Sequence, residues 1–123
     1  MLGDLDVTAF VATGDVGRAR AFYVEALGLG VVEESPFALV VRSGRTIVRV
    51  TPVENHRPVG YTVLGWTVPD VAATLRSLAE RGIEPLRFDG LDHDELGAWH
   101  APGGAFVAWF ADPDGNTLSL TQV

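Results

Sequence analysis

The stretch "VTAFVATGDVGRARAFYVEALGLG" (7–30) shares its pattern of residues with "TVLGWTVPDVAATLRSLAERGIE" (62–84), so the chain contains an internal repeat. Each copy begins with an apolar strand pattern and reaches an Asp-Val pair, at Asp15 and again at Asp70. An Asp side chain accepts hydrogen bonds from the first-turn N–H groups of a helix, so each Asp is a good helix N-cap. Apolar residues at helical spacing follow in both copies. The repeat therefore predicts two strand–helix units.

Both predicted helices end at a glycine, Gly28 and Gly82, where a left-handed residue commonly closes a helix. Three short strand patterns then follow in each half: "VVEE" (31–34), "FALVVRS" (37–43) and "TIVRVTP" (46–52), then "EPLRF" (84–88), "AFVAWFA" (105–111) and "TLSLTQV" (117–123). The second half carries an extra segment, "DGLDHDELGAWHAP" (89–102). We predict a single α+β domain spanning residues 1–123, with a first βαβββ module at 1–54, a linker at 55–60 and a second βαβββ module at 61–123.

The run "FADPDGNTLSLTQ" (110–122) joins two of these strands. Asp112 can accept backbone hydrogen bonds at the start of a turn, and Pro113 presets the next φ to about −65°. Gly115 can take the positive φ that ends the turn. These residues are explained by backbone needs, so the turn itself predicts a hairpin and no chemistry.

Composition narrows the possible partners. The chain has 123 residues, of which 47% are hydrophobic, enough for a folded core. A net charge of −7 without a basic cluster argues against nucleic acid or an anionic membrane as the partner, and a small neutral or cationic ligand fits better.

The chain contains no cysteine, and its nine basic residues are all Arg, which excludes a thiolate nucleophile and a Schiff-base lysine. No run is long enough to cross a bilayer, and "MLGDLDVTAF" has no signal-peptide pattern, so we expect a cytoplasmic protein.

Three stretches carry a family resemblance: "GDVGRARAFYVEALGL", "TVPDVAATLRSLAERGI" and "FADPDGNTLSL". In this order they resemble the vicinal oxygen chelate superfamily, which includes glyoxalase I, extradiol dioxygenases, fosfomycin-resistance enzymes and bleomycin-resistance proteins. The resemblance covers nearly the whole chain. It implies paired βαβββ modules that form a cupped mixed sheet around a cavity, commonly in a homodimer.

The resemblance also implies where metal-dependent members place their ligands. Seven residues before each capping Asp this chain has Thr8 and Val63, and four residues after Gly44 and Gly115 it has Val48 and Ser119. Divalent ions need carboxylate oxygen or imidazole nitrogen in several of these places, and none of the four supplies one. No ligand set is found among the neighbouring residues either: Val7, Ala9, Ile47, Arg49, Thr62, Leu64, Leu118 and Leu120. We therefore expect no metal and no cofactor, which argues against a metal-dependent glyoxalase or dioxygenase.

The histidines offer other chemistry. His100 lies in a predicted strand and could serve as a general acid or base, or it could be an ordinary exposed strand residue. His93 lies among Asp92, Asp94 and Glu95, a composition more typical of a solvated acidic loop than of a metal site. His56 lies in the linker, where we expect it to be solvated.

The aromatic residues are candidates for a ligand cavity. Phe10 shares a strand face with Thr8, which the resemblance turns toward the cup, whereas Trp66 is expected to pack under a helix. The sequence leaves open which faces Phe37, Trp99 and Trp109 occupy. Aromatic rings with a few polar groups are typical of small-molecule sites. The predicted ligand-binding set is Thr8, Phe10, Phe37, Val48, Val63, Trp99, Trp109 and Ser119.

Three functions remain open. The first is a metal-independent small-molecule-binding protein that sequesters an aromatic or cationic compound, with acidic residues at the rim of the cavity. The second is a cofactor-free isomerase, cyclase or lyase that uses His100 with the cavity hydroxyls of Thr8 and Ser119. The third is a degenerate module with no ligand. A cavity that contains both His100 and Ser119 would favour the enzyme, and an aromatic cup with His100 outside it would favour binding.

Overall fold

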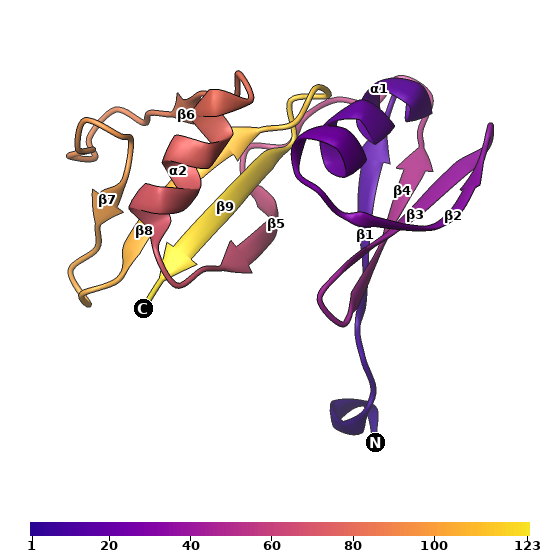
Figure 1. Ribbon diagram of the computed structural model, residues 1–123, viewed down its shortest axis with the longest axis horizontal. Helices are drawn as coiled ribbons and strands as arrows, with labels where there is room; N and C mark the ends of the chain where they lie inside the picture. The colour runs from indigo at the N-terminus through magenta and orange to yellow at the C-terminus, as the bar shows by residue number, and fades with distance from the viewer. The chain divides into compact units, whose positions relative to one another are not determined.

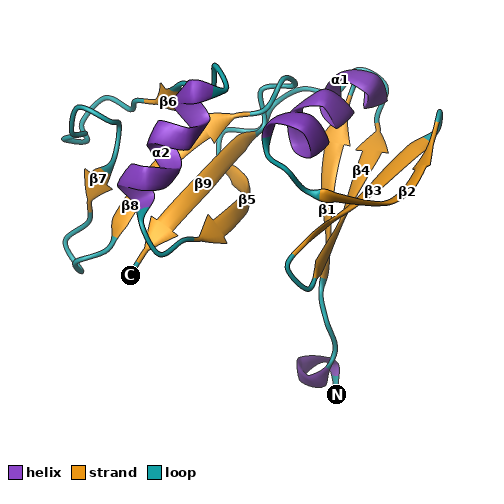
Figure 2. Cartoon of the chain, viewed as in Figure 1, coloured by secondary structure: helices purple, strands orange, loops and turns teal.

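The structure is a computed structural model that describes residues 1–123. The chain divides into two compact units, Met1–Arg57 and Pro58–Val123, whose elements are labelled in Figure 1. The boundary between the units falls inside the segment 55–60, which the sequence predicts to be a linker. Each unit has its own sheet and its own helix, as Figure 2 shows. The structure is therefore the α+β arrangement that the repeat predicts.

The first unit follows the order strand, helix, three strands. Its elements are a short 3-10 turn (Leu2–Asp4), β1 (Thr8–Thr13), α1 (Val16–Arg20) with a π-helical continuation (Ala21–Ala26), β2 (Gly30–Ser35), β3 (Ala38–Ser43) and β4 (Thr46–Pro52). The strand order in the sheet is β1-β4-β3-β2, in which β1 runs parallel to β4 and the other pairs are antiparallel.

The second unit repeats this order and adds one strand. Its elements are β5 (Thr62–Thr67), α2 (Val71–Glu80), β6 (Pro85–Leu86), β7 (Trp99–His100), β8 (Phe106–Ala111) and β9 (Thr117–Gln122). The strand order is β5-β9-β8-β6, and the extra strand β7 also pairs with β8. The predicted strand 84–88 keeps only two paired residues. The next residue, Arg87, donates from its side chain to the carbonyl oxygens of Asp94 and Glu95 at 2.9 and 2.8 Å.

Both helices begin and end as the sequence predicts. The Oδ1 atom of Asp15 accepts from the backbone N–H three residues later at 3.0 Å, and Asp70 does the same at 3.1 Å. Gly28 and Gly82 follow the two helices with φ of 81° and 77°, a conformation that favours glycine. Neither helix has the length and apolar character needed to span a membrane.

The core of the first unit lies between its helix and one face of its sheet. Helix α1 contacts β3 and β4, and Ala19 and Tyr23 on the helical segment are fully buried. The sheet residues beneath them are linked by pairing and are also buried: Leu39, Val41, Val48 and Val50. Each large side chain buried in this way stabilises the fold by roughly 1.5–3 kcal/mol.

The core of the second unit has the same construction. Helix α2 buries Val71, Leu75 and Leu78 against β8 and β9. Trp66 pairs with Leu120 and stacks on Phe110 with ring centroids 6.2 Å apart, so it packs on the helix side as predicted. The strand residues buried on this side are Ala108, Phe110, Leu118 and Leu120.

The turn between β8 and β9 is held by a buried carboxylate. Asp112 is 5% exposed, and its Oδ1 atom accepts from the backbone N–H groups of Asp114 and Asn116, each at 2.9 Å. Gly115 has φ of 82°, and a Cβ at this position would overlap the ring of Pro58. The prediction that this turn serves the backbone is confirmed.

Candidate functional site

Each sheet has one face that its own helix does not cover, and strand pairing tells which side chains lie on it. Directly paired residues point to the same side of a sheet, and successive residues alternate. We call the helix-free side of the first sheet the first open face; its members include Thr8, Phe10, Glu33, Val40, Arg42, Ile47, Arg49 and Thr51. We call the helix-free side of the second sheet the second open face; its members include Gly65, Trp99, Val107, Trp109, Ser119 and Thr121.

Val48 does not lie on an open face. It pairs with Ala9 and Val41 on the helix side of the first sheet and is 1% exposed, so no ligand can reach it. Arg49 takes the open position instead. Phe10 and Gly65 are equivalent positions, because each lies five residues before the Asp that caps the helix of its unit. Phe10 pairs with Arg49. Gly65 pairs with Ser119. Arg49 is therefore the counterpart of Ser119.

The difference is one residue of register. Counting four residues from the turn glycine reaches Ser119 on an open face but Val48 on a helix face, because β4 is shifted by one residue relative to β9. A one-residue shift moves every side chain of a strand to the other face. A pattern in the sequence does indicate that Arg49 is the counterpart of Ser119. In "TIVRVT" the valines alternate with polar residues, as the leucines do in "TLSLTQ".

The second open face carries two tryptophans next to Ser119. Trp109 pairs with Ser119, and Trp99 pairs with Val107 on the same side of the sheet. The two indole rings lie with centroids 6.2 Å apart and planes at 31°. A Cβ on Gly65 would overlap the Oγ atom of Ser119, so the glycine leaves space for this hydroxyl. The structure thus brings Trp99, Trp109 and Ser119 together.

The segment after β6 fixes the position of Trp109. The Phe88 ring meets Trp109 edge-on at 5.2 Å, and the His93 ring lies 6.1 Å from it. The Nε2 atom of His93 accepts from the Phe88 backbone N–H at 3.0 Å, which leaves Nδ1 to donate to the Gly97 carbonyl at 2.7 Å. The sequence missed this role, because hydrogen bonds from a side chain to the backbone leave no pattern in composition.

The acidic segment around His93 is ordered by its own carboxylate. The Oδ1 atom of Asp94 accepts from the backbone N–H groups of residues 96, 97 and 98 at 2.9, 3.0 and 3.0 Å. One oxygen of this exposed carboxylate is therefore engaged within the loop. The interpretation of this segment as a merely solvated acidic loop is incomplete, since it holds the aromatic ring of Phe88 and the imidazole of His93 against Trp109.

His100 lies away from this cluster. It pairs with Phe106 and stacks on that ring, with centroids 4.5 Å apart and planes at 12°. Phe106 and Trp109 are three residues apart on one strand, so they point to opposite faces. The structure therefore does not bring His100 together with Ser119.

Four further predicted residues lie apart from the aromatic cluster. Thr8 and Phe10 are exposed on the first open face, with Phe10 65% exposed. Phe37 is 81% exposed in the turn between β2 and β3, where its N–H donates to the Ser35 Oγ atom at 3.2 Å. Val63 is half-buried at an irregularity in the pairing of β5 with β9. These placements divide the predicted set between the two sheets.

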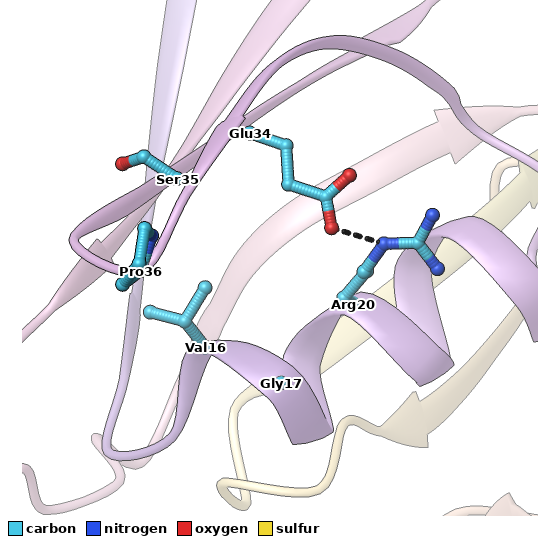
Figure 3. Close-up of a pocket in the computed structure, with 6 residues that line it drawn as sticks. All are labelled: Val16, Gly17, Arg20, Glu34, Ser35 and Pro36. Atoms are coloured by element: carbon cyan, nitrogen blue, oxygen red, sulfur yellow. Dashed lines mark hydrogen bonds and ion pairs between the residues drawn. The ribbon is translucent and has the colours of Figure 1, made fainter.

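A separate cavity of about 430 Å³ lies in the first unit between α1 and β2. Figure 3 shows the Glu34 carboxylate pointing at Arg20 across it, and the Arg20 guanidinium also contacts Glu25 at 3.1 Å. The cavity is lined by Val16, Gly17, Arg20, Glu34, Ser35 and Pro36. The charge of Arg20 is balanced by these acids, and none of the predicted ligand-binding residues lines the cavity.

The open faces do not fit a divalent metal. Nowhere in the structure do three His, Cys, Asp or Glu side chains gather as a metal centre would need. Metal-dependent relatives are expected to place their ligands at four strand positions. In this chain these positions hold the hydroxyls of Thr8 and Ser119, the apolar side chain of Val63 and, in place of Val48, the guanidinium of Arg49. A fixed positive charge repels a metal cation, so we derive no chemistry through one.

The architecture is a pair of strand–helix–strand modules, each with a sheet that is covered by a helix on one face and free of it on the other. The family model described as Glyoxalase/Bleomycin resistance protein/Dioxygenase superfamily matches residues 5–120. The chain therefore belongs to this superfamily.

Solved structures of similar fold include enzymes and binding proteins. A lactoylglutathione lyase from Agrobacterium tumefaciens is 18% identical, with a TM-score of 0.73 over 96% of this chain and 92% of that one. The bleomycin resistance determinant encoded on transposon Tn5 is 22% identical, with a TM-score of 0.75 over 96% and 97%. TnmS3, an antibiotic binding protein from Streptomyces sp. CB03234, is 26% identical, with a TM-score of 0.69 over 96% and 94%. No curated protein sequence matches this chain.

Proposed function

We propose that this protein binds a small organic molecule with a flat aromatic part, without a metal, on its second open face. The observation that carries the proposal is the pair of indole rings of Trp99 and Trp109, 6.2 Å apart beside the Ser119 hydroxyl. Stacking on such rings supplies affinity, and a single hydroxyl can orient a polar group of the ligand.

The surroundings of Trp109 support binding because they hold the ring in place. Phe88 and His93 contact Trp109, and His93 is itself fixed by hydrogen bonds through both ring nitrogens. A surface that is ordered before the ligand arrives loses less conformational entropy on binding. The relatives agree with this proposal, since TnmS3 is described as an antibiotic binding protein and the Tn5 protein as a bleomycin resistance determinant.

The cofactor-free enzyme has less support. It needs His100 and a cavity hydroxyl within reach of one substrate atom, and general acid–base catalysis requires hydrogen-bond distance. His100 stacks on Phe106 on the face opposite Ser119. This geometry favours binding over catalysis by this pair.

We also propose a homodimer in the cytoplasm, in keeping with the cysteine-free composition. Support for a dimer comes from exposed apolar side chains before β1: Leu2 is 70%, Leu5 63% and Val7 70% exposed. Light scattering of the purified chain should give twice the 13.1 kDa chain mass. A monomer at all concentrations would reject this part of the proposal.

The binding proposal is tested with 1-naphthol and its saturated analogue decahydro-1-naphthol, two neutral probes that differ in aromaticity. We expect 1-naphthol to bind and the saturated analogue to bind at least about tenfold more weakly. Trp109→Leu should weaken 1-naphthol by a similar factor, while the matched control Trp66→Phe, on the helix side, should leave it unchanged. Dialysis against EDTA should not change the affinity. Equal binding of both probes, or loss of binding in EDTA, would reject the proposal.

A further inference from the structure

The first open face carries two arginines that no acid neutralises. Arg42 pairs with Ile47, and Arg49 pairs with Val40, so the two arginines are diagonal neighbours on β3 and β4. Diagonal neighbours have Cα atoms about 7–8 Å apart, within reach of long side chains. Both residues are exposed, and neither side chain makes an ion pair or hydrogen bond in the structure.

This arrangement is unusual for so acidic a chain. Sixteen acidic residues oppose nine basic ones, yet Glu33 is the only acid among the strand residues of this face. The adjacent Glu34 turns to the helix side and pairs with Arg20 instead. Like charges on one face of a sheet destabilise it, so the pair of guanidinium groups carries a small cost that an anion would remove.

The residues around Arg49 indicate which kind of anion this face can bind. Phe10 is directly paired with Arg49 and leaves 65% of its surface open, next to the hydroxyl-bearing Thr8 on the same strand. Val40, which lies between Arg49 and Glu33 in the pairing, is 2% exposed and gives the face an apolar floor. A guanidinium binds a carboxylate with two parallel hydrogen bonds, and an aromatic ring offers a flat apolar surface beside it.

We propose that the first open face binds an aromatic carboxylate, with the carboxylate on Arg49 and Arg42 and the ring against Phe10. Arg49 stands where Ser119 stands in the second unit, so the two modules present different chemistry at equivalent strand positions. The first open face offers a fixed cation, and the second offers two indole rings and a hydroxyl. This site goes beyond the proposed function, because it does not require the second open face to bind anything.

The probe is sodium benzoate, and benzamide is its neutral counterpart of nearly the same shape. Titration of ¹⁵N-labelled protein should shift the amide signals of β1 and β4 with benzoate, and benzamide should bind at least about tenfold more weakly. Arg49→Gln should weaken benzoate roughly tenfold, and Arg42→Gln should weaken it by a smaller factor. The control Arg45→Gln removes the same charge from an 88% exposed side chain paired with Asp6, and it should change the affinity less than about twofold.

Several outcomes decide the proposal. If Arg49→Gln does not fold, Arg49→Lys keeps the charge but not the bidentate geometry, and it should still weaken benzoate severalfold. Trp109→Leu should leave benzoate binding intact, which separates this site from the aromatic site of the second unit. No shift with benzoate up to tens of millimolar, equal binding of benzamide, or equal losses in Arg49→Gln and Arg45→Gln would overturn the proposal.

Discussion

In the first unit β4 presents Arg49 to the open face, opposite an exposed Phe10, whereas in the second unit β9 presents Ser119 opposite Gly65 and beside Trp109. The helix sides of the two units, by contrast, are alike: an Asp cap, an apolar helix face and a layer of buried aliphatic residues. The repeated module thus preserves the side that folds it and varies the side that is free of the helix. On the helix-free side, residues can change to suit a ligand without loss of packing in the core.

The largest expected effect tests the register of β4. Val48→Asn should destabilise the first unit by about 3 kcal/mol or more, because it leaves an amide among packed apolar side chains. Arg49→Asn, one residue away on the open face, should change the free energy of unfolding by less than about 0.5 kcal/mol. Urea unfolding of both variants measures this difference. Similar costs for the two substitutions would show that Val48 and Arg49 do not face opposite sides.

A smaller effect is expected in the segment that only the second unit has. Asp94→Ala removes the acceptor of three backbone N–H groups, and we expect a loss of roughly 1–3 kcal/mol in the stability of this segment. Because the segment holds Phe88 and His93 against Trp109, 1-naphthol should also bind more weakly. Asp92→Ala is the matched control and should change neither. Hydrogen exchange of the amides of residues 96, 97 and 98 reports the local opening directly, and unchanged protection in Asp94→Ala would contradict this account.

The pairing of Gly65 with Ser119 predicts a measurable coupling. Gly65→Ala places a methyl group against the Ser119 Oγ atom, and we expect it to cost about 1 kcal/mol. In the background Ser119→Ala the same change should cost less, since the hydroxyl is gone. A double-mutant cycle from denaturant unfolding gives the coupling energy. Additive costs would mean that the two side chains are not in contact, and the second open face would then be wider at this point.

The smallest expected effect belongs to His100. His100→Ala removes a ring that stacks on Phe106 on the helix side of the sheet, and it should change stability by less than about 1 kcal/mol. The affinity for 1-naphthol should stay the same, because His100 does not share a face with Ser119. A large loss of affinity, measured by tryptophan fluorescence, would return His100 to the ligand site and revive the cofactor-free enzyme.

The sequence predicted the parts of the fold that depend on local rules. Asp15 and Asp70 cap helices, and Gly28 and Gly82 end them, because these residue types satisfy backbone needs that are the same in every protein. The prediction that Val48 binds the ligand was wrong, since the two turns were aligned on their glycines and the alternation of apolar and polar residues was not weighed. That alternation is the stronger signal, as it follows the pleat of the strand.

The candidate site was less predictable. Trp109 and Trp99 were recognised as possible ligand residues, but their shared face depends on pairing between β7, β8 and β9. The contacts of His93 and Asp94 run to backbone groups, and almost any residue could supply those groups. Such contacts depend on the path of the loop in space, which a single sequence does not encode in a readable pattern.

The most direct test of the proposed function uses the three tryptophans of the chain as reporters. Each indole N–H gives one signal in a ¹⁵N–¹H spectrum. Trp99 and Trp109 lie on the second open face, while Trp66 lies on the helix side of the same sheet. Titration with 1-naphthol should shift the signals of Trp99 and Trp109 in a saturable way and leave that of Trp66 nearly unchanged. Shifts of all three signals alike, or no shift at Trp109 while the ligand binds elsewhere, would contradict the proposal that this face is the binding site.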